Sequence, residues 1–146
     1  MTETINYKPL LCAAFPGTGK SYYCSQYVPD GWCCDSDSSQ FDKSNFPQNY
    51  IEHIKQRIVD KYERIFISSH KEVREALVKN GLKFTLIYPD KNLKQEYIDR
   101  YKRRGNLDNF IVLLEKNWEN WIDECIEQKG CAHIVLSSGQ YVANVV

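Results

Sequence analysis

The sequence predicts an α/β fold, a three-layer sandwich in which helices cover both faces of a five-stranded, mostly parallel sheet. Short apolar runs alternate along the chain with longer segments in which apolar residues recur every three or four positions. The runs are residues 10–15, 31–34, 64–68, 83–88 and 133–136. Strands separated by helices in this way pair in parallel, because each helix returns the chain to the starting edge of the sheet.

The predicted helices fill the intervals between these strands. The first begins inside a glycine-rich loop and ends near residue 27, before Pro29. The second covers residues 48–61. The third covers 71–79 and stops at Asn80-Gly81, and the fourth covers 93–104 and stops at Gly105. The longest covers 107–128, and its broad apolar face is expected to be core: Leu107, Phe110, Ile111, Leu114, Trp118, Trp121, Ile122 and Cys125.

Size and charge narrow the classes of protein that this chain can be. A chain of 146 residues fits a single domain. Basic and acidic residues number 19 each, so no net charge attracts nucleic acid, which is an unlikely partner. No apolar segment is long enough to span a bilayer, and residues 1–6 do not resemble a secretion signal. We therefore expect a cytoplasmic protein with no membrane partner.

The chain contains six cysteines, at positions 12, 24, 33, 34, 125 and 131. In a small secreted protein they would suggest three disulfides. Here no C-x-x-C pair and no secretion signal is found, and three of the six lie in or beside apolar runs. The sequence therefore predicts reduced, mostly buried thiols. The spacings needed for zinc are missing.

A phosphate-binding loop is predicted directly after the first strand. The segment Ala14-Phe15-Pro16-Gly17-Thr18-Gly19-Lys20-Ser21 satisfies the Walker A pattern G-x-x-x-x-G-K-[ST], except that alanine replaces the first glycine. Glycines let backbone N–H groups converge on a phosphate, and the following helix presents its N-terminus to the same anion. The expected residues for binding ATP or GTP are Pro16, Gly17, Thr18, Gly19, Lys20, Ser21 and Tyr22.

Two side chains of this loop have expected chemical roles. Lys20 would place its charge between the β- and γ-phosphates, and Ser21 would ligate Mg²⁺. The alternative is a glycine turn that happens to precede a lysine. The apolar strand before the loop and the helical segment after it favour the phosphate loop.

Two carboxylates, Asp35 and Asp37, follow the second strand. At the carboxyl end of a strand one of them can help to hold a metal, while the other accepts a proton from a substrate hydroxyl. The alternative is an acidic turn, since aspartate and serine favour turns.

These motifs together resemble the P-loop small-molecule kinases related to nucleoside-monophosphate kinases, shikimate kinase and gluconate kinase. The residues that carry the resemblance are Gly17-Thr18-Gly19-Lys20-Ser21, Asp35-Ser36-Asp37 and a basic segment at 93–106. The resemblance implies a P-loop NTPase fold of the nucleoside-monophosphate-kinase type over residues 1–146, with 93–106 as a short lid. It also implies that Asp35 lies near the metal and that Asp37 contacts the accepting hydroxyl.

The third strand ends at Ile67-Ser68-Ser69-His70, without the Walker B aspartate that many P-loop enzymes carry there. This departure disfavours a motor-type ATPase. Ser69 and His70 are expected to contact the acceptor. The alternative for Ser69 is that it caps the helix that begins near Lys71. The segment from Ser68 to Glu72, the basic helix and Asn117-Trp118 are also similar to uncharacterised P-loop proteins common in bacteriophages.

The predicted lid carries Arg100, Arg103 and Arg104. Arginine suits a lid that closes over a transferring phosphoryl group, because its charge is fixed and its donors match phosphate oxygens in pairs. The resemblance implies a catalytic role for at least one of the three. The alternative is that they are solvated cations placed favourably at the C-terminus of a helix.

The sequence therefore predicts an enzyme that uses Mg²⁺ to transfer the γ-phosphoryl group of ATP to a small acceptor, with a nucleoside, a nucleotide or an analogue as the favoured acceptor. Catalysis would depend on Lys20, Asp37 and one or more lid arginines, with Ser21 and Asp35 on the metal. The alternative is a nucleotide-binding regulatory or inhibitory module without transfer activity. The missing Walker B aspartate favours that alternative to some extent.

Overall fold

The computed structural model describes residues 10–26, 33–36 and 41–146 and has an α/β fold built on one parallel sheet. The strands are β1 (Leu11–Ala14), β2 (Cys33–Asp35), β3 (Arg64–Ser68), β4 (Thr85–Pro89) and β5 (Ala132–Leu136). The helices are α1 (Lys20–Gln26), α2 (Gln48–Val59), α3 (Lys71–Lys79), α4 (Lys94–Arg103) and α5 (Asp108–Glu127). Short 3-10 turns, η2 (Lys91–Leu93) and η3 (Val142–Asn144), precede α4 and end the chain.

The strands lie in the order β2-β3-β1-β4-β5, and every pair that the structure describes is parallel. The predicted alternation of strands and helices is confirmed, and the boundaries differ by only a few residues. β1 is central, with Ala14 level with Ser68 of β3 and Ile87 of β4. The carboxyl ends of β1 and β3 therefore lie side by side, which places the residues that follow them at one edge of the sheet.

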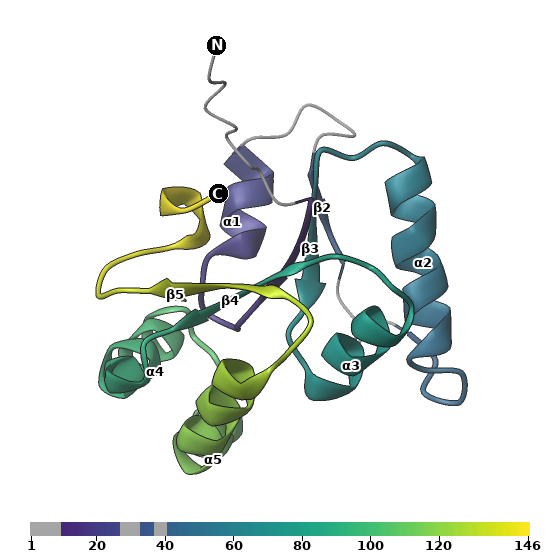
Figure 1. Ribbon diagram of the computed structural model, residues 1–146. Helices are drawn as coiled ribbons and strands as arrows, with labels where there is room; N and C mark the ends of the chain where they lie inside the picture. The colour runs from purple at the N-terminus through teal and green to yellow at the C-terminus, as the bar shows by residue number, and fades with distance from the viewer. Residues whose placement is uncertain (1–9, 27–32, 37–40) are drawn as a thin grey trace.

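Helices cover both faces of the sheet, as predicted. In Figure 1, α1 and the C-terminal turn lie on one side of the sheet, and α3, α4 and α5 lie on the other. The two faces form separate apolar clusters. On the α1 side, Tyr23 packs edge-on against Phe66 of β3, and Val142 of η3 is buried in the same cluster.

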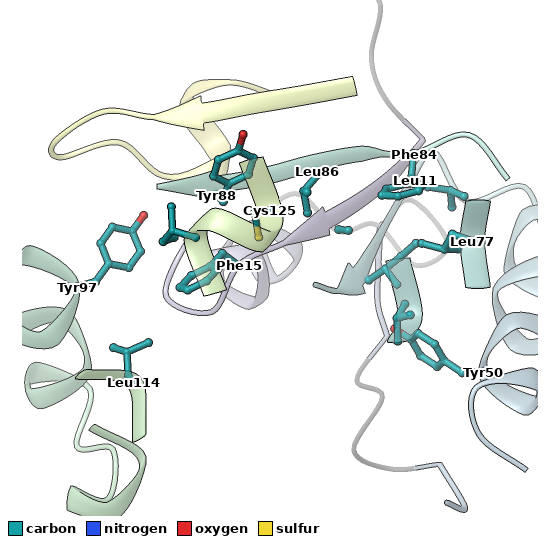
Figure 2. Packing of buried hydrophobic residues seen from close by; sticks show 14 of the residues in the cluster. Leu11, Phe15, Tyr50, Leu77, Phe84, Leu86, Tyr88, Tyr97, Leu114 and Cys125 are labelled. Atoms are coloured by element: carbon teal, nitrogen blue, oxygen red, sulfur yellow. The ribbon is translucent and has the colours of Figure 1, made fainter. Parts of the chain in front are cut away.

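The larger cluster lies between the sheet and helices α2 to α5 (Figure 2). Phe15, the residue after β1, packs edge-on against Tyr97 of α4 and Trp118 of α5, with ring centroids 6.4 and 5.6 Å away. Trp118 is fully buried, and its indole N–H donates to the carbonyl of Lys91 at 2.8 Å. These aromatic contacts fix α4 and α5 relative to the end of β1.

Two predictions about buried residues need correction. Leu107 is 73% exposed because it stands before the first turn of α5, where no element covers it. The cysteines are not all reduced thiols, since Cys24 of α1 and Cys33 of β2 form a disulfide. They are nine residues apart in sequence, and the fold brings their Cα atoms to 5.4 Å, a spacing that a disulfide can bridge. Cys12, Cys34, Cys125 and Cys131 are not in disulfides.

No helix within the described ranges is both long and apolar enough to cross a bilayer.

Candidate functional site

The predicted phosphate loop connects β1 to α1 and adopts the conformation that its glycines permit. Gly17 and Gly19 have φ values of 84° and 85°, in the left-handed region that side chains disfavour. Space is also restricted at both glycines. A Cβ atom on Gly17 would lie 2.8 Å from the hydroxyl of Tyr101, and one on Gly19 would lie 2.9 Å from the ring of Tyr141. Only glycine fits at either position.

The oxygen atoms of the loop are held by the surrounding protein. The Thr18 hydroxyl donates to the carbonyl of Phe15 at 2.7 Å, which closes the loop on itself. The Thr18 carbonyl accepts from the backbone N–H of Val142 at 2.9 Å. The Gly17 carbonyl accepts from Nη1 of Arg100 at 2.9 Å. The loop is therefore fixed from two sides, by α4 and by the C-terminal segment.

Four backbone N–H groups of the loop are not used in this way. Among the residues that the structure describes, no acceptor receives a hydrogen bond from the N–H of Gly17, Thr18, Gly19 or Ser21. A backbone donor needs a partner, so a run of unused donors at the start of a helix is the arrangement that binds an anion. The loop thus has the geometry of a phosphate cradle.

Arg100 is a structural support of this cradle. Its side chain is 4% exposed, and its guanidinium lies between the rings of Tyr97 and Tyr141, at 4.3 and 3.9 Å from their centroids. Nη2 pairs with Glu96 at 3.0 Å and also donates to the carbonyl of Gln140 at 2.9 Å. The sequence placed Arg100 among the lid arginines, but a guanidinium engaged in this way is not positioned to close over a phosphoryl group.

Glu96 connects α4 to the segment after β5. Besides Arg100, its carboxylate accepts from the backbone N–H of Gly139 at 2.9 Å and from the hydroxyl of Ser138. These hydrogen bonds, with Gly139 contributing most, lower the pKa of Glu96 below its ordinary value. The ionised carboxylate therefore holds the C-terminal segment against α4, and that segment in turn holds the loop.

A cleft of about 480 Å³ opens in front of the cradle. Its lining combines loop residues with residues of α1, the α4–α5 region and the C-terminal segment: Pro16, Gly17, Gly19, Lys20, Ser21, Tyr22, Arg100, Tyr101, Arg103, Arg104, Asn106, Phe110 and Tyr141. Arg103 and Arg104 are exposed, and neither forms an ion pair with a residue that the structure describes. All three predicted arginines and six of the seven predicted loop residues therefore line one cleft, and the seventh, Thr18, is fully buried.

Ser21 and Asp35 form the candidate metal site. The Ser21 hydroxyl donates to Oδ2 of Asp35 at 2.6 Å, so the first turn of α1 and the end of β2 meet beside the loop. A hydroxyl and one carboxylate suit Mg²⁺, which in phosphate sites keeps several waters and takes its other oxygens from the phosphates. Within the described ranges no three His, Cys, Asp or Glu side chains cluster around a metal position. The pair therefore fits a metal that arrives with a nucleotide.

β3 ends at Ser68, the position at which many P-loop enzymes carry the Walker B aspartate. Ser68 is buried, and its N–H donates to the hydroxyl of Tyr50 at 3.2 Å. The same hydroxyl donates to the carbonyl of Ser36 at 2.7 Å, so Tyr50 joins the ends of β2 and β3. Because β3 ends in a serine, the carboxylate beside the loop comes from Asp35 at the end of β2.

The remaining predicted residues lie at a second cavity or outside the described ranges. Ser69 and His70 line a separate cavity of about 310 Å³ that shares Pro16 and Phe110 with the cleft. Ser69 does not cap α3, whose N-cap is His70 and has no side-chain cap hydrogen bond. Asp37, the predicted contact to the acceptor hydroxyl, lies outside the described residues.

Sequence reasoning missed Tyr101 and Tyr141, the two tyrosines that pack against the glycines of the loop. Tyr101 lies four residues after Tyr97 on α4, a spacing that places both side chains on one face of the helix. Tyr141 follows the last strand in a short polar segment, and no local pattern marks it. Its position depends on the tertiary contacts of Arg100 and Val142.

No protein-family model, curated protein or solved structure matches this chain. Functional interpretation therefore depends on the loop motif and on the geometry around it.

Proposed function

We propose that the protein binds the Mg²⁺ complex of a nucleoside triphosphate, ATP or GTP, at the glycine loop and transfers the γ-phosphoryl group to a small acceptor. The observation that carries this proposal is the cradle itself. Its carbonyl oxygens are tied to Arg100 and Val142, while the N–H groups of Gly17, Thr18, Gly19 and Ser21 have no acceptor among the described residues. Such a cradle is pre-organised for an anion and serves little purpose in a purely structural protein.

Charged side chains around the cleft supply what phosphoryl transfer requires. Lys20 lines the cleft next to the loop, in position to contact the β- and γ-phosphates. Arg103 or Arg104 approaches from the other wall and can stabilise the charge that develops on the transferring group. Ser21 and Asp35 would hold the metal, whose contribution is to neutralise phosphate charge during transfer.

The transfer is a displacement at phosphorus. The acceptor hydroxyl oxygen forms a bond to the γ-phosphorus, and the bond from that phosphorus to the β–γ bridging oxygen breaks. The nucleoside diphosphate leaves with the bridging oxygen and its electron pair. The hydroxyl proton passes to a carboxylate, for which Asp37 remains the hypothesis, and then to water.

Calorimetry with Lys20→Ala tests the binding step. We expect the wild type to bind Mg²⁺–ATP or Mg²⁺–GTP and Lys20→Ala to lose at least tenfold in affinity, since a charge-assisted phosphate contact is lost. Lys79→Ala, at the end of α3 and away from the cleft, is the matched control and should bind normally. A wild type that binds neither nucleotide, or a Lys20→Ala variant that binds as well as the control, would contradict the proposal.

The second candidate function is a nucleotide-binding module without transfer activity. Ser68 favours it, because this buried hydroxyl stands at the end of β3, where a carboxylate would act on metal and water. Production of nucleoside diphosphate with a panel of acceptors separates the two functions. In an enzyme, Asp35→Asn and Arg103→Ala should retain nucleotide binding and lose turnover. A module should bind nucleotide with no turnover on any acceptor, in the wild type and in both variants.

A further inference from the structure

The second cavity, of about 310 Å³, lies on the helix-rich side of the sheet between the start of α3 and the middle of α5. Its volume is at the lower end of the range for small-molecule sites, about 300–1,000 Å³. It meets the nucleotide cleft at Pro16 and Phe110, which line both spaces. A molecule in this cavity would therefore lie next to the glycine loop at Pro16.

The walls of the cavity are mostly apolar and include three aromatic side chains, Phe15, Phe110 and Trp121. Phe15 and Cys125, each 2% exposed, are drawn in Figure 2 and contribute buried surface to it. Trp121 and Phe110 are only partly buried, and Leu113, also on α5, is 49% exposed. Aromatic side chains left accessible at a cavity, when their neighbours on the same helix are fully buried, suit a flat ring that stacks or packs against them.

The two cations that line the cavity, Arg74 and Lys71, each lie near an acidic side chain. Arg74 is 3% exposed, and its Nε donates to the carbonyl of Ser69 at 2.8 Å. Nη1 donates to the Glu124 carbonyl at 3.1 Å and to Oε1 of Gln128 at 2.8 Å, and Nη2 lies 3.7 Å from the Glu124 carboxylate. Lys71, at the rim, is 61% exposed and lies 3.9 Å from Glu75 on its own helix. A phosphate group would find no uncommitted arginine here and would face the Glu124 carboxylate.

We propose that this cavity binds the phosphoryl acceptor, and that the acceptor is a neutral or cationic molecule with a flat apolar ring and a hydroxyl group, such as a nucleoside, rather than a phosphate ester. Its assignment as the acceptor site rests on the proposed function. The ring packs against Trp121 and Phe110, Glu124 receives donors of the ligand, and the hydroxyl points past Pro16 toward the glycine loop. This refines the expectation from the sequence, which left nucleosides and nucleotides equally open.

Calorimetry on the full chain with two matched panels tests this inference. The panels are adenosine, guanosine, cytidine and uridine, and the corresponding 5′-monophosphates. We expect at least one nucleoside to bind at least tenfold more tightly than its monophosphate. Failure of every nucleoside to bind, or equal or tighter binding of the monophosphates, would overturn the inference.

Substitutions in α5 locate the binding. Trp121→Ala should weaken the nucleoside about tenfold or more, because stacking on one aromatic ring is lost, and Trp121→Phe should recover most of it. Val112→Ala, on the same helix but 63% exposed and outside the cavity lining, is the control and should change nothing. Equal affinity of Trp121→Ala and the control would place the nucleoside elsewhere and refute the assignment.

Glu124→Gln tests the charge argument. This substitution keeps the size of the side chain and removes the carboxylate that neutralises Arg74, so the preference for nucleoside over monophosphate should shrink at least threefold. An unchanged ratio would contradict the argument.

Mg²⁺–ATP binding, measured on the same samples, separates this inference from the proposed function. If nucleosides bind at Trp121 but no triphosphate binds, the proposed function and the role of acceptor site both fail, and the cavity stands only as a nucleoside site. If the triphosphate binds and the nucleosides do not, the cavity assignment fails and the proposed triphosphate binding stands.

Discussion

Replacing two arginines of α4 should affect different properties, the stability of the fold in one case and turnover in the other. Arg100 and Arg103 are three residues apart and both line the cleft in front of the glycine loop. Arg100 is buried and bound to the loop, whereas Arg103 is exposed. We expect Arg100→Ala to destabilise the fold and to weaken nucleotide binding through it. We expect Arg103→Ala to leave stability unchanged and to affect turnover.

The magnitude for Arg100 follows from its contacts. Its guanidinium donates to two backbone carbonyls, pairs with Glu96 and lies between two aromatic rings. Breaking a buried, hydrogen-bonded ion pair costs about 3–5 kcal/mol. The lower end applies here, because Glu96 is 26% exposed and can still be hydrated after its partner is removed. At about 3 °C per kcal/mol for a chain of this size, Arg100→Ala should lower the Tm by about 10 °C.

For Arg103 the expected change in stability follows from its exposure, and the expected change in turnover follows from its proposed contact with the transferring phosphoryl group. Substitution of an exposed residue without buried contacts changes stability by less than about 0.5 kcal/mol. An arginine that stabilises a transferring phosphoryl group is worth about 10³-fold or more in turnover. Arg104→Ala, also at the cleft, should carry the same loss if that residue acts in place of Arg103.

Thermal denaturation and calorimetry with Mg²⁺–ATP measure the two effects on the same samples. Arg100→Lys is a useful intermediate, because it keeps the charge but cannot reach the Gly17 and Gln140 carbonyls together. It should fall between the wild type and Arg100→Ala in Tm. An Arg100→Ala variant with the Tm of the wild type would refute the view that this side chain supports the loop.

Three further predictions test other parts of the structure. Gly19→Ala should weaken Mg²⁺–ATP binding at least tenfold by calorimetry, whereas Gly105→Ala, also at positive φ but with no atom within 4 Å of its Cβ, should cost only about 1–2 kcal/mol of backbone strain in thermal denaturation. The folded state lowers the pKa of Glu96, so its contribution to stability is present above its ordinary pKa of 4.5 and is lost as pH falls through the folded value. In urea unfolding between pH 7 and 3, Glu96→Gln should therefore lose less free energy of unfolding than the wild type. Dithiothreitol should lower the stability of the wild type by about 3 kcal/mol, as expected for a disulfide that closes a loop of about ten residues, and should not affect Cys24→Ser; equal responses would show that Cys24 and Cys33 are not paired in solution.

The sheet could be predicted from the sequence because each strand is a short apolar run flanked by polar turns. Residues 64–68 were predicted as a strand and form β3 without a change of boundary, and residues 71–79 form α3 in the same way. The glycine loop was equally accessible, since its function requires particular residue types at fixed spacing. Local pattern therefore determined the elements and the position of the glycine loop.

The support of the loop could not be predicted in the same way. Arg100 was recognised as a cation near a helix end, and nothing in its local sequence distinguishes it from Arg103. The difference depends on burial, which is set by the packing of α4 against the C-terminal segment through Tyr97 and Tyr141. The disulfide was missed for a similar reason, because the proximity of Cys24 and Cys33 depends on α1 packing beside β2.

The contacts around the loop also explain how a short chain can hold the glycine loop in place. Gly17 is held by α4 through Arg100, and Thr18 is held by the C-terminal segment through Val142. Those two supports are themselves joined, because Glu96 of α4 binds Ser138 and Gly139 after β5. The three connections form a closed ring, so the loop is held by these contacts as well as by its glycine motif. A binding assay that responds to Glu96 as well as to Lys20 would therefore be expected from this structure, although Glu96 contacts no phosphate.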